Sequence, residues 1–172
     1  VRLVTPAGRD VLVYLVLGVG AGACQTFGKW LMVRVLDRVH RPTERRDVLA
    51  AGLAVGLGFG LSEVLFIGGQ LIAAGSAITG IGAIGIWERC AAVGFHVYSG
   101  GLIAIGIALR RAWPLLVVLV LHSLEDWLAG AVGAGRMAIP PVALETLYTL
   151  ATVLLLALFR RGARTLPEVL PR

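Results

Sequence analysis

The segment VLAAGLAVGLGFGLSEVLFI, which runs from Val48 to Ile67, decides the fold class of this chain. Its twenty residues contain a single ionisable side chain, that of Glu63. This is the length of an α-helix that crosses the roughly 30 Å hydrocarbon core of a bilayer. A helix on the surface of a soluble protein would instead carry a polar face. The segment therefore predicts a membrane-spanning helix.

The composition of the whole chain predicts a single integral membrane domain, residues 1–172. Hydrophobic residues make up 58% of the chain and charged residues 15%, whereas soluble domains are about a quarter charged. The net charge of +6 does not indicate a nucleic-acid partner, because the basic residues gather mostly between apolar blocks. We expect the lipid bilayer to be the main partner and no nucleic acid to bind.

Other apolar blocks complete an all-α, polytopic transmembrane helical bundle. We predict about five spans, at Val11–Val33, Val48–Ile67, Cys90–Leu109, Leu115–Gly130 and Val142–Phe159. The block Leu71–Ile86 is rich in glycine, a poor helix former, so we predict an outer loop there, either interfacial or re-entrant. Pro114, Pro140 and Pro141 are placed to open the last two spans, where a missing N–H costs least.

The arginines indicate how the spans are oriented. Eleven basic residues lie in three segments: Arg34, Arg38, Arg41, Arg45 and Arg46; Arg110 and Arg111; and Arg160, Arg161, Arg164 and Arg172. If Leu71–Ile86 does not span, all three segments lie on one side of the membrane. The positive-inside rule then predicts a multi-pass protein of the cell membrane with its N-terminus outside and its C-terminus in the cytoplasm.

Four ionisable residues lie in the outer halves of three predicted spans: Glu63, His96, His122 and Asp126. With a helical rise of 1.5 Å per residue, they sit roughly 6 to 12 Å below the outer ends of their helices. His122 and Asp126, four residues apart, share one helix face. A charge at the bilayer centre costs about 2.5 to 3.5 kcal/mol, so each of these residues needs a partner or a function.

These residue types suit a divalent metal, and zinc fits them best. Imidazole nitrogens and carboxylate oxygens are zinc ligands, and catalytic zinc sites commonly use three protein ligands and a water. Glu63, His96 and His122 would supply such a set. Asp126 would be a fourth ligand or would orient an imidazole. The alternative is that these groups only satisfy one another or pair with Arg89.

Arg89 and its neighbour Glu88 begin the third span. We expect Arg89 to pair with Glu63, Asp126 or Glu145, as buried polar networks do. Residues adjacent in a helix do not face each other, so Glu88 and Arg89 are expected to reach different partners.

Two further features of the spans are interpreted as structural. Lys29, inside the first span, is expected either to pair with an acid or to extend toward the cytoplasmic interface. Gly52, Gly56 and Gly60 are spaced by four residues and form a stripe of small side chains along which another helix can approach closely.

Three short motifs occur in a particular order along the chain. They are GLGFGLSE at Gly56–Glu63, the pair Glu88-Arg89 followed by Phe95-His96, and LHSLED at Leu121–Asp126. Together they resemble the YhfC family of intramembrane metalloproteases. That family is grouped with PrsW-type proteases, with the CAAX prenyl endopeptidases of the CPBP superfamily, and with the Aph scaffold subunit of gamma-secretase. The resemblance covers roughly residues 23–128.

The resemblance implies a hydrolase whose site lies within the bilayer. Phe59 and Glu63 match the FxxxE motif, His96 matches the histidine of another motif, and His122 with Asp126 matches HxxxD. In proteolytic relatives these groups surround the scissile bond, and a Glu pair in an EExxR or EExxK motif is the general base. The resemblance thus implies metal ligation by all four ionisable residues and catalytic roles for Glu63 and Asp126.

The chain departs from the family where the Glu pair is expected. The segment reads Gln25-Thr26-Phe27-Gly28-Lys29, so the basic residue fits but both acids are absent. One prediction is an active intramembrane metalloendopeptidase that cleaves a transmembrane peptide and uses Glu63 as its base. The alternative is a non-catalytic pseudoprotease that acts as a scaffold or binding subunit for a partner helix. A transporter or permease component, in which buried acids and histidines relay protons, is a third possibility.

Overall fold

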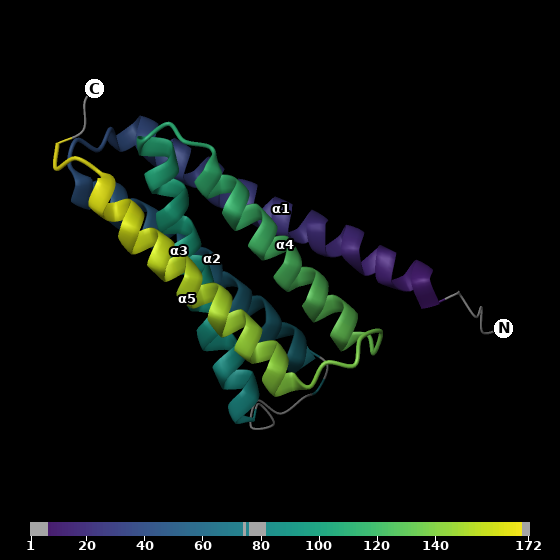
Figure 1. The fold of residues 1–172 in the computed structure, drawn as a ribbon. Helices are drawn as coiled ribbons and strands as arrows, with labels where there is room; N and C mark the ends of the chain where they lie inside the picture. Colours follow the sequence, from purple (N-terminus) through teal and green to yellow (C-terminus); the bar gives the residue numbers. More distant parts are fainter. Residues whose placement is uncertain (1–6, 74, 76–81, 170–172) are drawn as a thin grey trace.

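A computed structural model describes residues 7–73, 75 and 82–169, and these fold into a bundle of long helices (Figure 1). The helices are α1 (Ala7–His40), α2 (Arg45–Ala73), α3 (Ala83–Ala108), α4 (Trp113–Gly133) and α5 (Pro141–Thr165). All five are long and apolar enough to cross a membrane. The prediction of a helical bundle with about five spans is confirmed.

Apolar side chains on the outside of the bundle show how it fits a bilayer. Leu65 is 76% exposed and Phe66 is 65% exposed, and similar leucines and valines project from α1, α4 and α5. In water, so large an apolar surface would drive aggregation. The chain is therefore a multi-pass membrane protein.

The helices extend further than their apolar blocks predicted. The first three residues of the block Leu71–Ile86 belong to α2, and its last four open α3, so the prediction of a loop is wrong at both ends. Helical hydrogen bonds continue there because neither end carries proline, and glycine only weakens a helix. The middle of the block, residues 74 and 76–81, lies outside the described residues. The proline prediction holds, since Pro114 and Pro141 lie in the first turns of α4 and α5.

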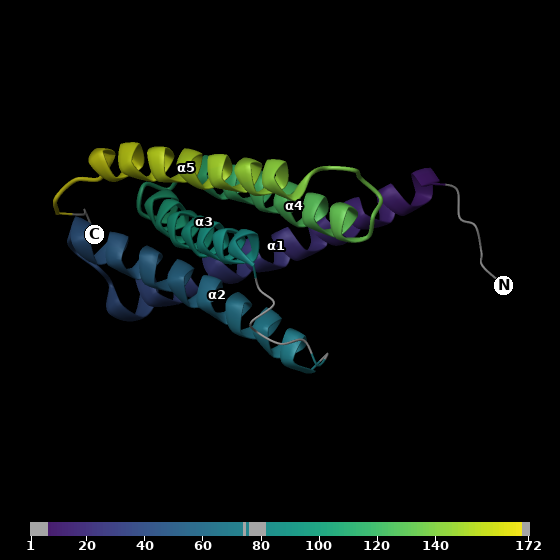
Figure 2. The same ribbon diagram turned by 90° about the horizontal axis from the view of Figure 1, so that it is seen from below.

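Helix α3 is the central element of the bundle. It packs against α2 on one side and α5 on the other, while α1 packs along α4 (Figure 2). Buried Phe95, Leu102, Ile103 and Ile105 of α3 form much of the apolar interior. A residue near the middle of α3 is therefore surrounded by protein rather than by lipid.

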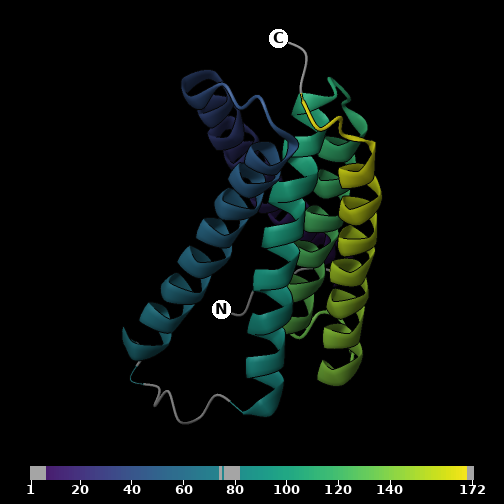
Figure 3. The ribbon, with the colours of Figure 1, turned by 90° about the vertical axis from the view of Figure 1, so that its left-hand side faces the viewer.

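Glycines set the closest helix approaches. A Cβ on Gly56 would lie 2.2 Å from the carbonyl oxygen of His96, and one on Gly52 would lie 2.5 Å from the Cβ of Ala104. The predicted stripe in α2 thus forms its contact with α3. Beyond this contact α2 diverges from α3 toward Ala73 (Figure 3). In α1, Gly18 and Gly22 form an equivalent close contact with the backbone of α4.

The three arginine-rich segments lie at one end of the bundle (Figure 1). The segment after α5 contacts the loop between α1 and α2 through a backbone bridge from Val169 to Glu44, and it contacts the start of α2 through a 2.6 Å salt bridge from Glu168 to Arg45. The loop between α3 and α4, with Arg110 and Arg111, lies at the same end. Arg172 lies outside the described residues.

Candidate functional site

Glu63 of α2 and His96 of α3 meet where the glycine stripe brings their helices together. The His96 Nε2 atom donates a 2.8 Å hydrogen bond to Glu63 Oε2. His96 is buried, with 2% of the residue exposed. Since Nε2 carries the proton in this contact, the lone pair of a neutral His96 is at Nδ1, which is buried without a hydrogen-bond partner among the described residues.

Arg89 of α3 holds the other oxygen of Glu63. Its NH1 atom lies 3.1 Å from Glu63 Oε1, which is one of the three pairings predicted for it. The guanidinium also contacts the carboxylate of Glu88, so the prediction that Glu88 and Arg89 reach different partners is wrong. Both side chains are long and lie near the start of α3, where they can fold toward each other although their Cβ atoms diverge.

His122 of α4 faces His96 across the bundle. The two ring centroids are 5.1 Å apart, and the rings meet edge to face. His122 Nδ1 and Thr26 Oγ1 of α1 are joined by a 3.3 Å hydrogen bond. Asp126, one turn further along α4, has its Oδ2 atom 3.9 Å from His122 Nε2, too far for a hydrogen bond.

Glu63, His96, His122 and Asp126 all line one small cavity, which we call the acid–histidine cavity. Its volume is about 70 Å³, space for about two waters at roughly 30 Å³ each. The other lining residues with polar side chains are Glu88, Arg89, Glu125 and Tyr148. The structure thus brings the four predicted site residues to one place, from three different helices.

The donor set only partly fits a metal. His96 Nδ1 and Asp126 Oδ2 are buried nitrogen and oxygen donors without hydrogen-bond partners among the described residues. Yet within the described part of the chain no three His, Cys, Asp or Glu residues are arranged to hold a metal ion. Metal binding would therefore require these side chains to move closer together.

Two members of the cavity were missed in the sequence. Glu125 has one buried carboxylate oxygen without a hydrogen-bond partner among the described residues, and the Tyr148 hydroxyl of α5 donates a 3.0 Å hydrogen bond to the Glu125 backbone carbonyl. Glu125 precedes Asp126 and could have been included as a second intramembrane acid. Tyr148 could not have been identified from the sequence, because a tyrosine in an apolar helix does not by itself indicate a functional site.

Lys29 adopts neither of its predicted arrangements. Its side chain is 0% exposed, and the ammonium donates a 3.0 Å hydrogen bond to Ser99 Oγ, whose own hydroxyl donates to the His96 carbonyl. The ammonium also lies 5.7 Å from the ring centroid of Phe95. The prediction that Lys29 pairs with an acid or extends to the interface is wrong, because α3 packs over it.

The two positions that replace the expected Glu pair differ in their surroundings. Thr26 is buried and contacts His122, as described above. Gln25 is partly exposed and does not line the acid–histidine cavity. A carboxylate at position 26 would therefore stand directly beside an imidazole of the site.

The fold and cavity define a multi-pass helical membrane protein with an acid- and histidine-lined interior. Comparison with family models, curated proteins and solved structures finds no match to this chain. The resemblance to the YhfC family consequently stays a prediction.

Proposed function

We propose that this chain is an intramembrane metalloprotease-like protein that hydrolyses a peptide bond within or beside the bilayer. The observation that carries the proposal is that Glu63, His96, His122 and Asp126, from three helices, line one cavity large enough for water. Buried ionisable groups are costly in a membrane and are placed there for a function. Their order along the chain, with the motif resemblance, favours this class of hydrolase.

Each residue has a role in this proposal. Glu63 is the general base that takes a proton from the attacking water and passes it to the departing amine as the C–N bond breaks. Arg89 fixes the Glu63 carboxylate, and Thr26 orients His122. His96, His122, Glu63 and Asp126 are the residues that would hold a divalent metal, with zinc the best fit. A bound metal would polarise the peptide carbonyl and acidify the water.

The orientation follows from the arginines. The arginine-rich end of the bundle faces the cytoplasm by the positive-inside rule, so the N-terminus lies outside and the acid–histidine cavity lies in the outer half of the membrane. The cavity is too small for a peptide. We therefore propose that a transmembrane or membrane-adjacent peptide reaches it from the lipid side, with the helices separating locally.

Metal content is the direct test. Protein purified in detergent without chelators is expected to contain close to one zinc per chain, and His96→Ala and His122→Ala to lose most of it. His40→Ala is the matched control, because the third histidine of the chain is exposed at the end of α1. Absence of metal from folded wild type, or equal loss in the control, would contradict metal binding at this site.

A specific observation favours the non-catalytic scaffold as a second candidate. Thr26 occupies the place beside His122 where an acid would be the base, and Glu63 is engaged by both Arg89 and His96. Cleavage of a transmembrane model substrate by wild type and by Gln25→Glu/Thr26→Glu separates the two. If only the double variant cleaves, the chain is a scaffold. If wild type cleaves as fast, it is an enzyme that uses another base.

A further inference from the structure

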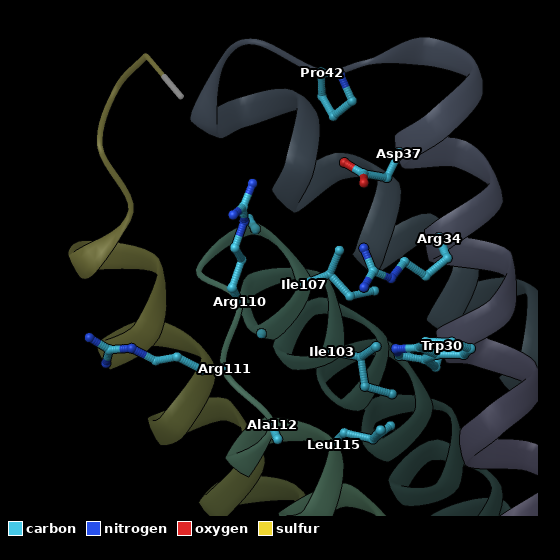
Figure 4. Close-up of a pocket in the computed structure, with 12 residues that line it drawn as sticks. Trp30, Arg34, Asp37, Pro42, Ile103, Ile107, Arg110, Arg111, Ala112 and Leu115 are labelled. Carbon is cyan, nitrogen blue, oxygen red and sulfur yellow. The ribbon is translucent and has the colours of Figure 1, made fainter. Parts of the chain in front are cut away.

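A second and larger cavity lies at the arginine-rich end of the bundle, away from the acid–histidine cavity. We call it the arginine cavity. Its volume is about 690 Å³, within the range of ligand pockets in proteins. Its walls come from the last third of α1, the loop after α1, the end of α3 and the start of α4 (Figure 4).

The cavity has a basic rim. Arg34 from α1 and Arg110 from the loop after α3 stand around it with Asp37 (Figure 4). Neither arginine forms a salt bridge with any carboxylate of the described residues. Arg111 also lines the cavity, but its side chain extends away toward α5 (Figure 4). The rim thus carries two guanidinium groups and one carboxylate, and a bound anion would balance the excess positive charge.

The opposite wall is apolar. Ile103 and Leu115 lie below Arg34 and Arg110 in Figure 4, and Ile107 lies between these two arginines. The Trp30 ring lies beside them, and the Arg34 guanidinium lies 5.7 Å from its centroid. A ligand that fits both walls has a charged head and an apolar body.

Arg110 occupies a backbone position that usually belongs to glycine. The Arg110 and Arg111 amides donate to the carbonyls of Ile107 and Gly106, the two hydrogen bonds of a Schellman motif, and Arg110 has a φ of 53°. The same motif ends α4, with Gly135 at the equivalent position at a φ of 67°. An arginine in this conformation costs about 1 kcal/mol of backbone strain. The conformation places the Arg110 side chain at the rim of the cavity.

We propose that the arginine cavity binds the phosphate of an anionic phospholipid from the adjacent leaflet. Arg34 and Arg110 are the phosphate ligands, because a guanidinium donates two parallel hydrogen bonds to phosphate oxygens. The start of α4 at Trp113 adds the partial positive charge of a helix N-terminus. The first carbons of an acyl chain lie against Ile103 and Leu115. Basic pockets between membrane helices are known to hold such headgroups.

Lipid titration of the purified full chain tests the proposal. Phosphatidylglycerol added to protein in neutral detergent is expected to raise the thermal unfolding midpoint, and phosphatidylcholine is not. Each arginine near a membrane surface contributes about fivefold in affinity for anionic lipid, so Arg34→Gln/Arg110→Gln should weaken binding roughly 30-fold. Arg34→Gln and Arg110→Gln alone should each weaken it about fivefold, which gives a test if the double variant does not fold.

Arg38→Gln/Arg164→Gln is the matched control, since both arginines are exposed at the same end of the bundle and neither lines the arginine cavity. It should bind phosphatidylglycerol nearly as tightly as wild type. Equal weakening in both double variants would show attraction to surface charge alone and overturn the proposal. An equal rise in midpoint with inorganic phosphate or glycerol 3-phosphate would mean that the site takes a soluble anion, which also overturns it.

Discussion

The two cavities of this protein share walls from α3 and α4 but differ in how their charged side chains are paired. The acid–histidine cavity is about 70 Å³, and Glu63 in its wall is bonded to both His96 and Arg89. The arginine cavity is about 690 Å³, and Arg34 and Arg110 have no carboxylate partner among the described residues.

In the first cavity, side chains of the protein hold one another in place. In the second, the arginines lack a negatively charged partner. In the acid–histidine cavity, the fold itself supplies most partners, so a substitution should act through stability and the positions of neighbouring side chains. In the arginine cavity, the missing partner is an anion, so a substitution should act through binding. Variants of the two cavities and of the helix contact between them test this contrast.

Gly56→Ala should destabilise the protein most. Its Cβ would lie 2.2 Å from the His96 carbonyl oxygen, so α2 and α3 must separate where Glu63 meets His96. Overpacking of this kind costs about 1 to 3 kcal/mol, and backbone contact places it at the upper end. Thermal unfolding in detergent measures it. Gly58→Ala is the control, because a Cβ there meets nothing within 4 Å. Equal midpoints for the two variants would mean that the helices do not approach as described.

A double-mutant cycle of Glu63→Gln and Arg89→Gln measures how far the acid–histidine cavity satisfies itself. The two side chains are 3.1 Å apart and partly buried, so we expect a coupling free energy in the range of about 0.5 to 3 kcal/mol. Unfolding of the four proteins gives the value. The same cycle on Arg46 and Glu44, an exposed pair, should give less than about 1 kcal/mol. A coupling free energy of zero for Glu63 and Arg89 would mean that the two side chains do not stabilise each other, and the proposed difference between the two cavities would then be wrong.

Thr26→Val should have a moderate effect on stability. It keeps the shape of the side chain but removes the hydroxyl bonded to His122 Nδ1, which costs about 0.5 to 1.5 kcal/mol. Thr146→Val is the control, because that hydroxyl is exposed and bonds only within its own helix. If Thr26→Val were no more destabilising than the control, His122 would be positioned without Thr26.

Arg110→Gly should stabilise the lipid-free protein slightly, by about 0.5 to 1 kcal/mol, since glycine adopts the positive φ of this position without strain. The same variant should lose stabilisation by phosphatidylglycerol. Gly135→Ala, in the equivalent motif after α4, should instead destabilise by about 1 kcal/mol. Unfolding midpoints with and without lipid measure both. A destabilised lipid-free Arg110→Gly protein would show that the arginine serves the fold and not a ligand.

Much of this arrangement could be predicted from the sequence. Apolar blocks of about 20 residues gave the five helices, and Pro114 and Pro141 marked two of their starts. The helix ends around Leu71–Ile86 could not be placed, because glycine weakens a helix without ending it. The four site residues could be identified because an ionisable side chain inside a membrane costs free energy and therefore needs a partner or a function. The contacts that they form could not be predicted.

The amino-acid sequence was enough to predict that this chain spans a membrane several times, and which ionisable residues lie inside the spans. Those properties depend on length and hydrophobicity along one segment at a time. The packing of the helices was needed to show that Lys29 is covered by α3, that Thr26 faces His122, and that Arg34 and Arg110 border one cavity. These contacts depend on how each helix is rotated against its neighbours. That rotation is set by close contacts such as Gly56 against His96, between residues far apart in the chain.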